Sequence, residues 1–534
     1  MDQEALFMGF DSSTQGLKCT ILDRDLQIVY ERALDFDRDL PAFGTQGGAH
    51  TSADGLTVTS PSLMWVSALD HLLAAMQLEK APLSRVRAIS GSGQQHGSVW
   101  LGSGAGTALA NLRGDSTLAS QLEGIFRVPD SPIWKDSSTG LQCKAREAAM
   151  GGAQALAELT GSRAYERFTG NQIAKIYELQ PDAYRETERI CLVSSFMASL
   201  LIGAYAPIDA SDGSGMNLMD IRTRDWSTAA LACTAPGLGA KLGRVVASHE
   251  VVGSLHPYYS QRYGFGDGVK VIAFSGDNPN SLAGLRQQAP GDIAISLGTS
   301  YTVFGFLAEA RPSASEGHIF VNPVAPDAYM ALLCYKNGAL IREGIRDARA
   351  GADWRTFSRL VAETPAGNEG RIGFYLVDPE ITPPIHKTGI RRFDRQNRPV
   401  SDFSDGAECR AVVEGQCLSM RLHGANVGFE PKRILATGGA SVDVEMLRVM
   451  SHIFGVPVFV AEKSDTASLG AAYRALHGLA CAEAGTFVGF ADALGKEMPL
   501  RCAAEPDAAL HAMYSEMLGR YACLEKQIIK EEPS

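Results

Sequence analysis

The sequence predicts a mixed α/β protein built from two domains of related construction. Residues 6–34 are predicted to form three strands, the first two of which flank the polar turn SSTQG. Residues 293–307 repeat this plan as two strands around Thr-Ser. Apolar segments that end in glycine, such as 86–93, alternate with segments of helical spacing, such as 62–77. Because about 290 residues separate the two hairpins, far more than in a solenoid repeat, each hairpin is expected in its own domain.

The length of the chain and one polar break set the expected domain boundary. The 534 residues suffice for two large domains, since one domain takes roughly 150 residues. The segment RQQAPGD at 286–292 interrupts the apolar pattern with Pro and Gly before the second hairpin. We therefore predict domains at 1–288 and 289–534, with a cleft between them that faces both turns. Further elements are predicted as strands at 269–278 and 432–440 and as a helix at 444–455.

Composition and charge exclude several classes of protein. Apolar residues make up 45% and charged residues 20% of the chain, as in ordinary globular proteins. The net charge is −11 and no run of Lys or Arg is present, so nucleic acid is not an expected partner. The ten cysteines form no C-x-x-C pattern. No apolar run approaches the roughly 20 residues of a membrane span, and acidic residues precede the first apolar stretch, so a cytoplasmic protein is expected.

Both hairpin turns are suited to phosphate. Tight turns of Gly, Ser and Thr let backbone N–H groups approach an anion, and such turns occur at Ser12–Gly16, which contains Thr14, and at Gly298–Ser300, which contains Thr299. Asp11 adds a carboxylate that could hold a metal-bound water. Each turn alone is typical of an ordinary hairpin. Since the chain has neither a P-loop nor a dinucleotide fingerprint, the duplicated turns favour an actin-like ATPase scaffold.

Other candidate residues follow predicted strands. Gly438 and Gly439 would let a flat ligand lie against the backbone, or they form a plain strand-to-helix turn. Asp277 and Asn278 could face a cleft, or form an Asx turn. His96 stands beside two glutamines that offer donors and acceptors to a polyol, although a lone histidine is more often structural.

With these residues in view, the chain resembles the FGGY carbohydrate kinases over nearly its whole length, and within that family the longer, eukaryotic-type xylulose kinases. The resemblance runs from GFDSSTQGLK (9–18) to SDTASLGAAYRAL (464–476). The stretches that carry it are SGSGQQHGSVW (90–100), DSPIWKDSST (130–139), GGAQALAELTGSRAYERFTGNQIAKIYE (151–178), SDGSGMNLMDI (211–221) and SGDNPNSLAG (275–284). It implies two actin-like domains of the ribonuclease H-like (ASKHA) class, the first for sugar and the catalytic base, the second for nucleotide.

The resemblance also implies a role for each candidate residue. Asp277 would be the general base, and the ketose would be contacted by His96, Arg167, Asp277 and Asn278. Asp11 would be the acid associated with Mg²⁺. The residues implied on the ATP side are Thr14, Thr299, Trp354, Gly438, Gly439 and Val442.

Position 442 departs from the pattern of the family. The related kinases place an asparagine after GGAS that contacts nucleotide, whereas this chain has Val442, which cannot make that hydrogen bond. Asp443 could substitute from the next position, or the backbone alone could hold the adenosine.

The resulting expectation is an enzyme that uses ATP and Mg²⁺ to convert D-xylulose to D-xylulose 5-phosphate. One alternative is a kinase for another ketose or polyol, such as L-ribulose or glycerol. The other is a sugar sensor that has the fold without transfer, for which Val442 is the only support. A monomer and a homodimer are both compatible with the sequence.

Overall fold

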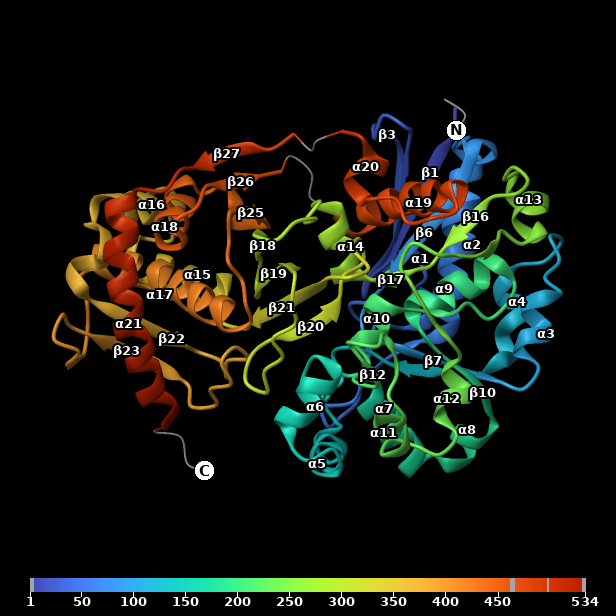
Figure 1. Ribbon diagram of the computed structural model, residues 1–534, viewed down its shortest axis with the longest axis horizontal. Coiled ribbons are helices and arrows are strands. Elements are labelled where there is room, and N and C mark those ends of the chain that lie inside the picture. The colour runs from blue at the N-terminus through green and yellow to red at the C-terminus, as the bar shows by residue number, and fades with distance from the viewer. Residues whose placement is uncertain (1–3, 462–465, 497–498, 531–534) are drawn as a thin grey trace. The chain divides into compact units, whose positions relative to one another are not determined.

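The computed structural model describes residues 4–461, 466–496 and 499–530. These residues divide into two compact units, drawn in Figure 1. Unit 1 contains 4–288 together with 319–329 and 466–496, and unit 2 contains 289–318, 330–461 and 499–530. Two later segments of the chain thus return to the unit formed by its first half. The functional division predicted for 1–288 and 289–534 stays a prediction.

A twisted sheet forms the centre of unit 1. Its first three strands form an antiparallel meander, and a parallel strand, β6, lies on the other side of β1. Next to β6 come the parallel strand β16 and the antiparallel strand β15, which gives the order β15-β16-β6-β1-β2-β3. The strands are β1 (Leu6–Ser12), β2 (Gly16–Leu22), β3 (Ile28–Asp35), β6 (Val86–Gly93), β15 (Val251–Ser254) and β16 (Lys270–Ile272). The predicted meander at 6–34 and the strand at 86–93 are therefore confirmed.

A helix from near the end of the chain packs on this sheet. In Figure 1 the helix α19 (Thr466–Ala484), drawn in red, lies beside the blue strands β1 and β6. The approach is close, since a Cβ on Gly9 of β1 would lie 2.1 Å from the carbonyl oxygen of Ser468. Thr20 and Ser468 also share a hydrogen bond of 2.8 Å between their hydroxyl oxygens. Glycine at position 9 is thus required by the helix rather than by the strand. Residues 464 and 465 of the resemblance lie outside the described residues.

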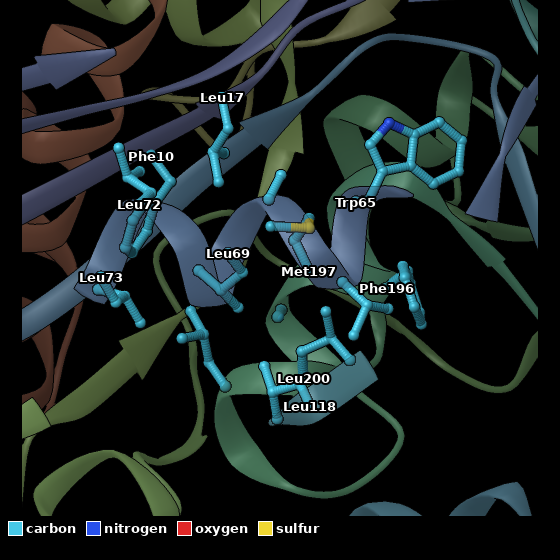
Figure 2. Packing of buried hydrophobic residues seen from close by; sticks show 14 of the residues in the cluster. Phe10, Leu17, Trp65, Leu69, Leu72, Leu73, Leu118, Phe196, Met197 and Leu200 are labelled. Carbon is cyan, nitrogen blue, oxygen red and sulfur yellow. The ribbon is translucent and has the colours of Figure 1, made fainter. Parts of the chain in front are cut away.

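The apolar core of unit 1 lies between the sheet and two helices. The helix α2 (Ser62–Leu78) contributes Trp65 and Leu69, and the helix α9 (Val193–Ile202) contributes Phe196. Figure 2 shows these side chains together with Phe10 of β1. Apolar residues occupy most of the surface of α2, as expected of a helix covered on several sides. The predicted helix at 62–77 is confirmed.

The sheet of unit 2 repeats the plan of unit 1. An antiparallel hairpin of β18 and β19 lies beside the parallel strand β25, which is followed by the parallel strand β26. Six strands run in the order β21-β19-β18-β25-β26-β27. They are β18 (Asp292–Leu297), β19 (Tyr301–Leu307), β21 (Tyr329–Tyr335), β25 (Arg433–Thr437), β26 (Val458–Val460) and β27 (Arg501–Ala504). The repeat predicted from the two hairpins is confirmed as a repeat of sheet topology.

Two other predicted elements differ in detail. The apolar segment 269–278 does not form one strand, because β16 stops at Ile272 and a second short strand, β17 (Ser275–Gly276), pairs separately with β6. The helix predicted at 444–455 is present as α18 (Val444–Phe454), and Gly455 ends it in the left-handed conformation. In the described part of the chain no helix is both long and apolar enough to cross a bilayer.

Candidate active site

Three strands of unit 1 bring polar side chains to the same edge of the sheet. Asp11 at the end of β1 pairs in register with Ser92 of β6, and Ser92 pairs with Ser275 of β17. The Ser92 hydroxyl donates a hydrogen bond of 2.7 Å to Asp11 Oδ1. Asp11 is only 4% exposed. Carboxyl ends of neighbouring parallel strands are where α/β proteins bind ligands, so this edge is the candidate site.

The first hairpin turn begins at this edge, directly after β1. Thr14 lies in the turn between β1 and β2, and its hydroxyl oxygen accepts a hydrogen bond of 2.8 Å from the indole N–H of Trp134. The backbone at Gly48 packs closely against the turn, because a Cβ on Gly48 would lie 1.8 Å from the carbonyl oxygen of Thr14. The turn is therefore held in place by contacts with two separate segments of unit 1.

Asp277 begins a helix directly after β17. It is the first residue of α14 (Asp277–Gly284), and its carboxylate accepts hydrogen bonds from the backbone N–H of Asn278 over 2.9 Å and from the Asn278 side-chain amide over 3.2 Å. That amide also donates to Gln95 Oε1 over 2.8 Å. Burial raises the pKa of Asp277 to about 6, and the backbone N–H of Asn278 opposes the rise. A carboxylate with this pKa is ionised near neutral pH and basic enough to accept a proton.

His96 follows β6 with a fixed ring orientation. Its backbone has φ of +69°, which turns the side chain away from the path of the strand. Because a carbonyl only accepts, the 3.0 Å bond between Nδ1 and the carbonyl oxygen of Gly215 places the ring hydrogen on Nδ1. Burial, aided by Arg167, lowers the pKa of His96 to about 3, so the ring is neutral. Nε2 is therefore left as an acceptor.

Arg167 lies next to His96 on aromatic side chains. Its guanidinium carbon is 5.1 Å from the ring centre of Tyr165 and 5.4 Å from that of Phe168. The His96 ring is itself 4.5 Å from Phe168. The first arginine of the same motif, Arg163, is instead paired with Glu147 over 3.1 Å. Arg167 thus lies beside the site, whereas Arg163 is held in an ion pair with Glu147.

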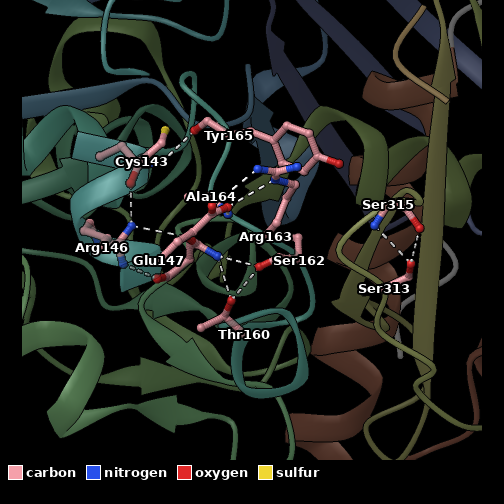
Figure 3. Close-up of polar contacts among 12 residues, drawn as sticks. Cys143, Arg146, Glu147, Thr160, Ser162, Arg163, Ala164, Tyr165, Ser313 and Ser315 are labelled. Carbon is pink, nitrogen blue, oxygen red and sulfur yellow. Dashed lines mark hydrogen bonds and ion pairs between the residues drawn. The ribbon is translucent and has the colours of Figure 1, made fainter. Parts of the chain in front are cut away.

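A buried arginine supports the segment that carries Arg167. Arg146 is 1% exposed and donates to Asn171 Oδ1 over 2.7 Å and to the carbonyl oxygen of Asn217 over 2.6 Å. The Asn217 amide in turn donates to the Thr160 hydroxyl over 2.6 Å. Figure 3 shows this network beside the pair of Glu147 and Arg163. The acceptors of these hydrogen bonds from Arg146 are neutral, and burial lowers the pKa of Arg146.

In unit 2 the second hairpin turn and the glycine pair lie on neighbouring strands. Thr299 is exposed in the turn after β18, and its carbonyl oxygen accepts from the Ala339 N–H over 3.1 Å. Gly438 has φ of +84°, and a Cβ there would lie 2.9 Å from the backbone carbon of Leu297. A Cβ on Gly439 would meet nothing within 4 Å. Gly438 is thus required by the backbone, whereas Gly439 leaves open space.

Val442 and its neighbour have different surroundings. Val442 is 82% exposed. Asp443 caps α18, since Oδ1 accepts from the N–H groups of Glu445 and Met446 over 3.0 and 3.2 Å, and Oδ2 accepts from the Ser358 hydroxyl over 2.5 Å. Both oxygens of Asp443 are thus engaged in the fold, and the substitution of Asp443 for the asparagine that the resemblance implies stays a prediction.

Trp354 is the first residue of α16 (Trp354–Glu363). The guanidinium carbon of Arg346 lies 4.6 Å from its ring centre, and Phe357 packs on the ring edge-on with 5.4 Å between the centres. The ring is partly exposed. One aromatic surface is thus available on the same helix that carries Ser358, the partner of Asp443.

The residues present are compatible with Mg²⁺ held mainly by a substrate. No group of three or more acidic, His or Cys side chains suited to a metal occurs among the described residues. Mg²⁺ is usually held by one or two carboxylates, waters and substrate phosphates rather than by a protein cage. Asp11 supplies one buried carboxylate beside a phosphate-type turn, which fits that mode.

Several polar groups near Asp277 were not among the predicted site residues. They are buried and have no hydrogen-bond partner within the described parts of the chain: Ser12 Oγ, Gln94 Oε1 and Nε2, Gln95 Nε2, Asp212 Oδ1 and Ser275 Oγ. The two glutamines carried a signal, since they precede His96 in SGSGQQHGS. Asp212 carried none, because its burial follows from contacts between distant segments. Such unpaired groups are expected where a polar ligand supplies the missing partners.

The structure brings the predicted residues together within each unit. Unit 1 holds Asp11, Thr14, His96, Arg167, Asp277 and Asn278 around one sheet edge, and unit 2 holds Thr299, Trp354, Gly438, Gly439 and Val442 on neighbouring elements. Two sheets of the same topology, each with a hairpin turn of small polar residues, define a two-domain α/β fold of the actin-like class.

Comparison with known proteins places this fold in one family. Family models of the FGGY carbohydrate kinases match residues 130–284, as the N-terminal domain, and 293–479, as the C-terminal domain. The chain is 52% identical to the xylulose kinase of Mus musculus over 98% of this chain and 94% of that protein. It is 48% identical to xylulose kinase 2 of Arabidopsis thaliana over 91% and 89% of the two chains. The chain belongs to the FGGY family of carbohydrate kinases.

A solved structure agrees with this fold. The xylulose kinase from Rhodospirillum rubrum superposes with a TM-score of 0.79 at 16% identity, covering 98% of this chain and 99% of the other. At that identity the likeness concerns the fold. The predicted fold class and the resemblance to the family are confirmed.

Proposed function

We propose that this protein transfers the γ-phosphoryl group of ATP to D-xylulose and releases ADP and D-xylulose 5-phosphate. The proposal rests on the site at the strand edge, where Asp277, Asn278 and His96 lie among buried polar side chains. The choice of D-xylulose is supported by the 52% identity to a mouse xylulose kinase across nearly the whole chain. We also propose that 1–288 serves mainly the sugar and 289–534 mainly the nucleotide.

Asp277 is the proposed base. As the terminal hydroxyl oxygen of the ketose attacks the γ-phosphorus, its proton passes to the Asp277 carboxylate and the bond from phosphorus to the ADP oxygen breaks. The two hydrogen bonds from Asn278 fix the carboxylate before the sugar arrives. Phosphoryl transfer depends mainly on positioning and charge neutralisation. A preset carboxylate can position the hydroxyl group and accept its proton, whereas neutralisation of the phosphate charge falls to Mg²⁺ and backbone N–H groups.

Neighbouring side chains are proposed to recognise the hydroxyl groups of the ketose. The neutral His96 ring offers Nε2 as an acceptor, since Nδ1 is committed to Gly215. Arg167 offers donors from a position fixed by Tyr165 and Phe168. The Asn278 amide adds polar contacts from the start of α14. Together these groups present donors and an acceptor, as a polyol requires.

The remaining predicted residues are proposed to serve the nucleotide. The turns at Thr14 and Thr299 direct backbone N–H groups at phosphates, and Gly438 with Gly439 forms a flat surface for adenosine, with Val442 and Trp354 nearby. Mg²⁺, when bound, neutralises phosphate charge, and Asp11 would hold it directly or through water. The cytoplasmic location stays a prediction.

The experiment that tests this proposal is ADP release from ATP with and without D-xylulose. A kinase releases ADP in proportion to added ketose, and mass spectrometry finds a pentulose phosphate. A sugar sensor on the same fold binds D-xylulose in calorimetry but releases no ADP. The second outcome would contradict the proposal.

A further inference from the structure

Asp212 is a buried acid that the proposed mechanism does not use. It lies on α10 (Ala210–Ser214), and its side chain is 2% exposed. The Ser194 hydroxyl donates to Oδ2 over 2.5 Å, whereas Oδ1 has no hydrogen-bond partner among the residues that the structure describes. Burying a polar group without a partner is costly. An acid in this state therefore requires an explanation beyond packing.

Asp212 lies close to Gly276, the residue that precedes the proposed base. A Cβ placed on Gly276, the residue before Asp277, would lie 2.8 Å from Asp212 Oδ1 and 2.9 Å from the amide carbon of Gln95. Gln95 Nε2 makes no hydrogen bond of standard geometry within the described chain, but the Gln95 side chain lies close enough to Asp212 to interact with its carboxyl. Gln95 Oε1 accepts from the Asn278 amide over 2.8 Å. Polar side chains thus run from Asp212 past Gln95 to Asn278, which holds Asp277.

The surroundings of Asp212 oppose its negative charge. Burial raises the pKa of Asp212 to about 8, and the carboxylates of Asp209 and Asp277 add to the rise. The hydrogen bond from Ser194 and the nearby Gln95 side chain oppose it. His96, whose ring lies near Gly215 at the end of α10, is neutral. Among the described residues, the charged and titratable groups near Asp212 include Asp209, Asp277 and His96, together with the buried Arg474, whose positive charge favours ionised Asp212.

We propose that Asp212 is a positioning residue for phosphoryl transfer: in its uncharged form it orients Gln95 and Asn278 toward Asp277 and keeps the two neighbouring acids at a single negative charge. The inference rests on the proposed function, in which Asp277 is the base. When Asp212 ionises, a second buried negative charge stands near the base and near the phosphates that must approach it. Like charges at a shared site oppose one another, so transfer slows.

The pH dependence of kcat/KM for D-xylulose tests this role. In the wild type, kcat/KM rises through about pH 6 and falls above about pH 8. Asp212→Asn carries no charge at any pH, so it keeps the rise and loses the fall. The ratio of variant to wild-type kcat/KM is expected to be about tenfold higher at pH 9 than at pH 7. An equal alkaline fall in both proteins overturns the inference.

Two further variants separate this role from a structural one. Asp209→Asn makes the same chemical change three residues away and preserves the cap, in which Asp209 Oδ2 accepts from the Asp212 N–H over 3.2 Å. Because the Asp209 carboxylate adds to the raised pKa of Asp212, this variant should keep the alkaline fall but move it to lower pH. Ser194→Ala removes a hydrogen bond that favours ionised Asp212, so the fall should move to higher pH. An alkaline fall that Ser194→Ala does not move contradicts the inference.

Thermal melting supplies a readout that needs no turnover. A carboxyl whose folded pKa lies above its unfolded value destabilises the protein increasingly as pH rises between the two. The Tm of the wild type should therefore fall relative to that of Asp212→Asn between pH 5 and pH 8. Parallel curves contradict the inference about Asp212, whereas a wild type without ketose-dependent ADP release contradicts the proposed function instead.

Discussion

The backbone N–H and the side-chain amide of Asn278 both donate to the same oxygen of Asp277, over 2.9 and 3.2 Å. Two bonds to one oxygen fix the plane of the carboxylate at the first turn of α14. The helix N-terminus favours the ionised form, while burial opposes it and raises the pKa of Asp277 to about 6. The result is an ionised acid that can still accept a proton at neutral pH.

The first prediction concerns Asp277→Asn. Asparagine preserves the shape but cannot accept the proton, so kcat should fall on the order of 10²–10⁴-fold. ADP affinity in calorimetry should hardly change, and Tm should not fall, because burial disfavours the carboxylate in the folded protein. Asp267→Asn, on an exposed loop, is the matched control. Near-normal turnover, or loss of activity only through unfolding, would make Asp277 a structural residue.

The second prediction is the acid limb of the pH profile. Because the ionised form of Asp277 is the active one, kcat/KM should rise about tenfold per pH unit below pH 6 and level off between about pH 6 and pH 7.5. Steady-state rates between pH 4.5 and 7.5 test this. A profile that is flat between pH 5 and 7 would show that no group of this pKa acts as the base.

The third prediction concerns nucleotide affinity. Val442→Asn introduces an exposed amide at the position where the resemblance implies an asparagine in related kinases, and Asp443 is already engaged in capping α18. ADP should bind more tightly by about 0.5–1.5 kcal/mol, the net contribution of one hydrogen bond, with ketose affinity unchanged. Val444→Asn, the same change at the start of α18, is the control for calorimetry. No gain with ADP, or an equal gain in the control, would mean that position 442 does not contact nucleotide.

The fourth prediction concerns the stability of unit 2. His423 on α17 (Asp405–Asn426) lies between Glu316 and Glu525, 3.1 Å from a carboxylate oxygen of each. Burial lowers its pKa, but the hydrogen bonds to both glutamates outweigh this and raise the pKa of His423 to about 9. Its stabilisation is therefore complete below about pH 6.5 and is lost as pH rises toward 9.

His423→Gln should lower the free energy of unfolding at pH 7 by about 3–5 kcal/mol, because two buried carboxylates lose their cation. The loss should shrink toward pH 9. Denaturant unfolding at both pH values measures it, with His71→Gln on the exposed face of α2 as the control. A loss that does not depend on pH would mean that His423 is neutral in the fold.

Local patterns in the sequence predicted much of the fold and part of the site. Apolar segments that flank turns of small polar residues indicated β1, β2, β18 and β19, and Gly455 indicated the end of α18. These features depend on neighbours in the chain. The return of α19 to β1 was not predicted, because it depends on the contact of Gly9 with Ser468, and no local pattern encodes that contact.

The same limit applies within the site. Arg163 and Arg167 are both arginines of the motif RAYER. The structure distinguishes them, because Arg163 pairs with Glu147 on another helix whereas Arg167 lies over Tyr165 and Phe168. Asp212 resembles any polar residue of a glycine-rich turn until its burial behind Gly276 is known. Residues that contact substrate could be proposed from the resemblance, whereas residues that support them required the three-dimensional contacts.

The most direct test of the account is the kcat/KM of the wild type for D-xylulose, L-ribulose and glycerol, measured by coupled ADP release at one pH and saturating ATP. A site that hydrogen-bonds each hydroxyl rejects analogues that misplace or lack one, by up to roughly 10⁴-fold where a buried partner is left unpaired. The account predicts that D-xylulose has the highest kcat/KM by a wide margin. A value for L-ribulose or glycerol equal to or above that of D-xylulose would contradict it.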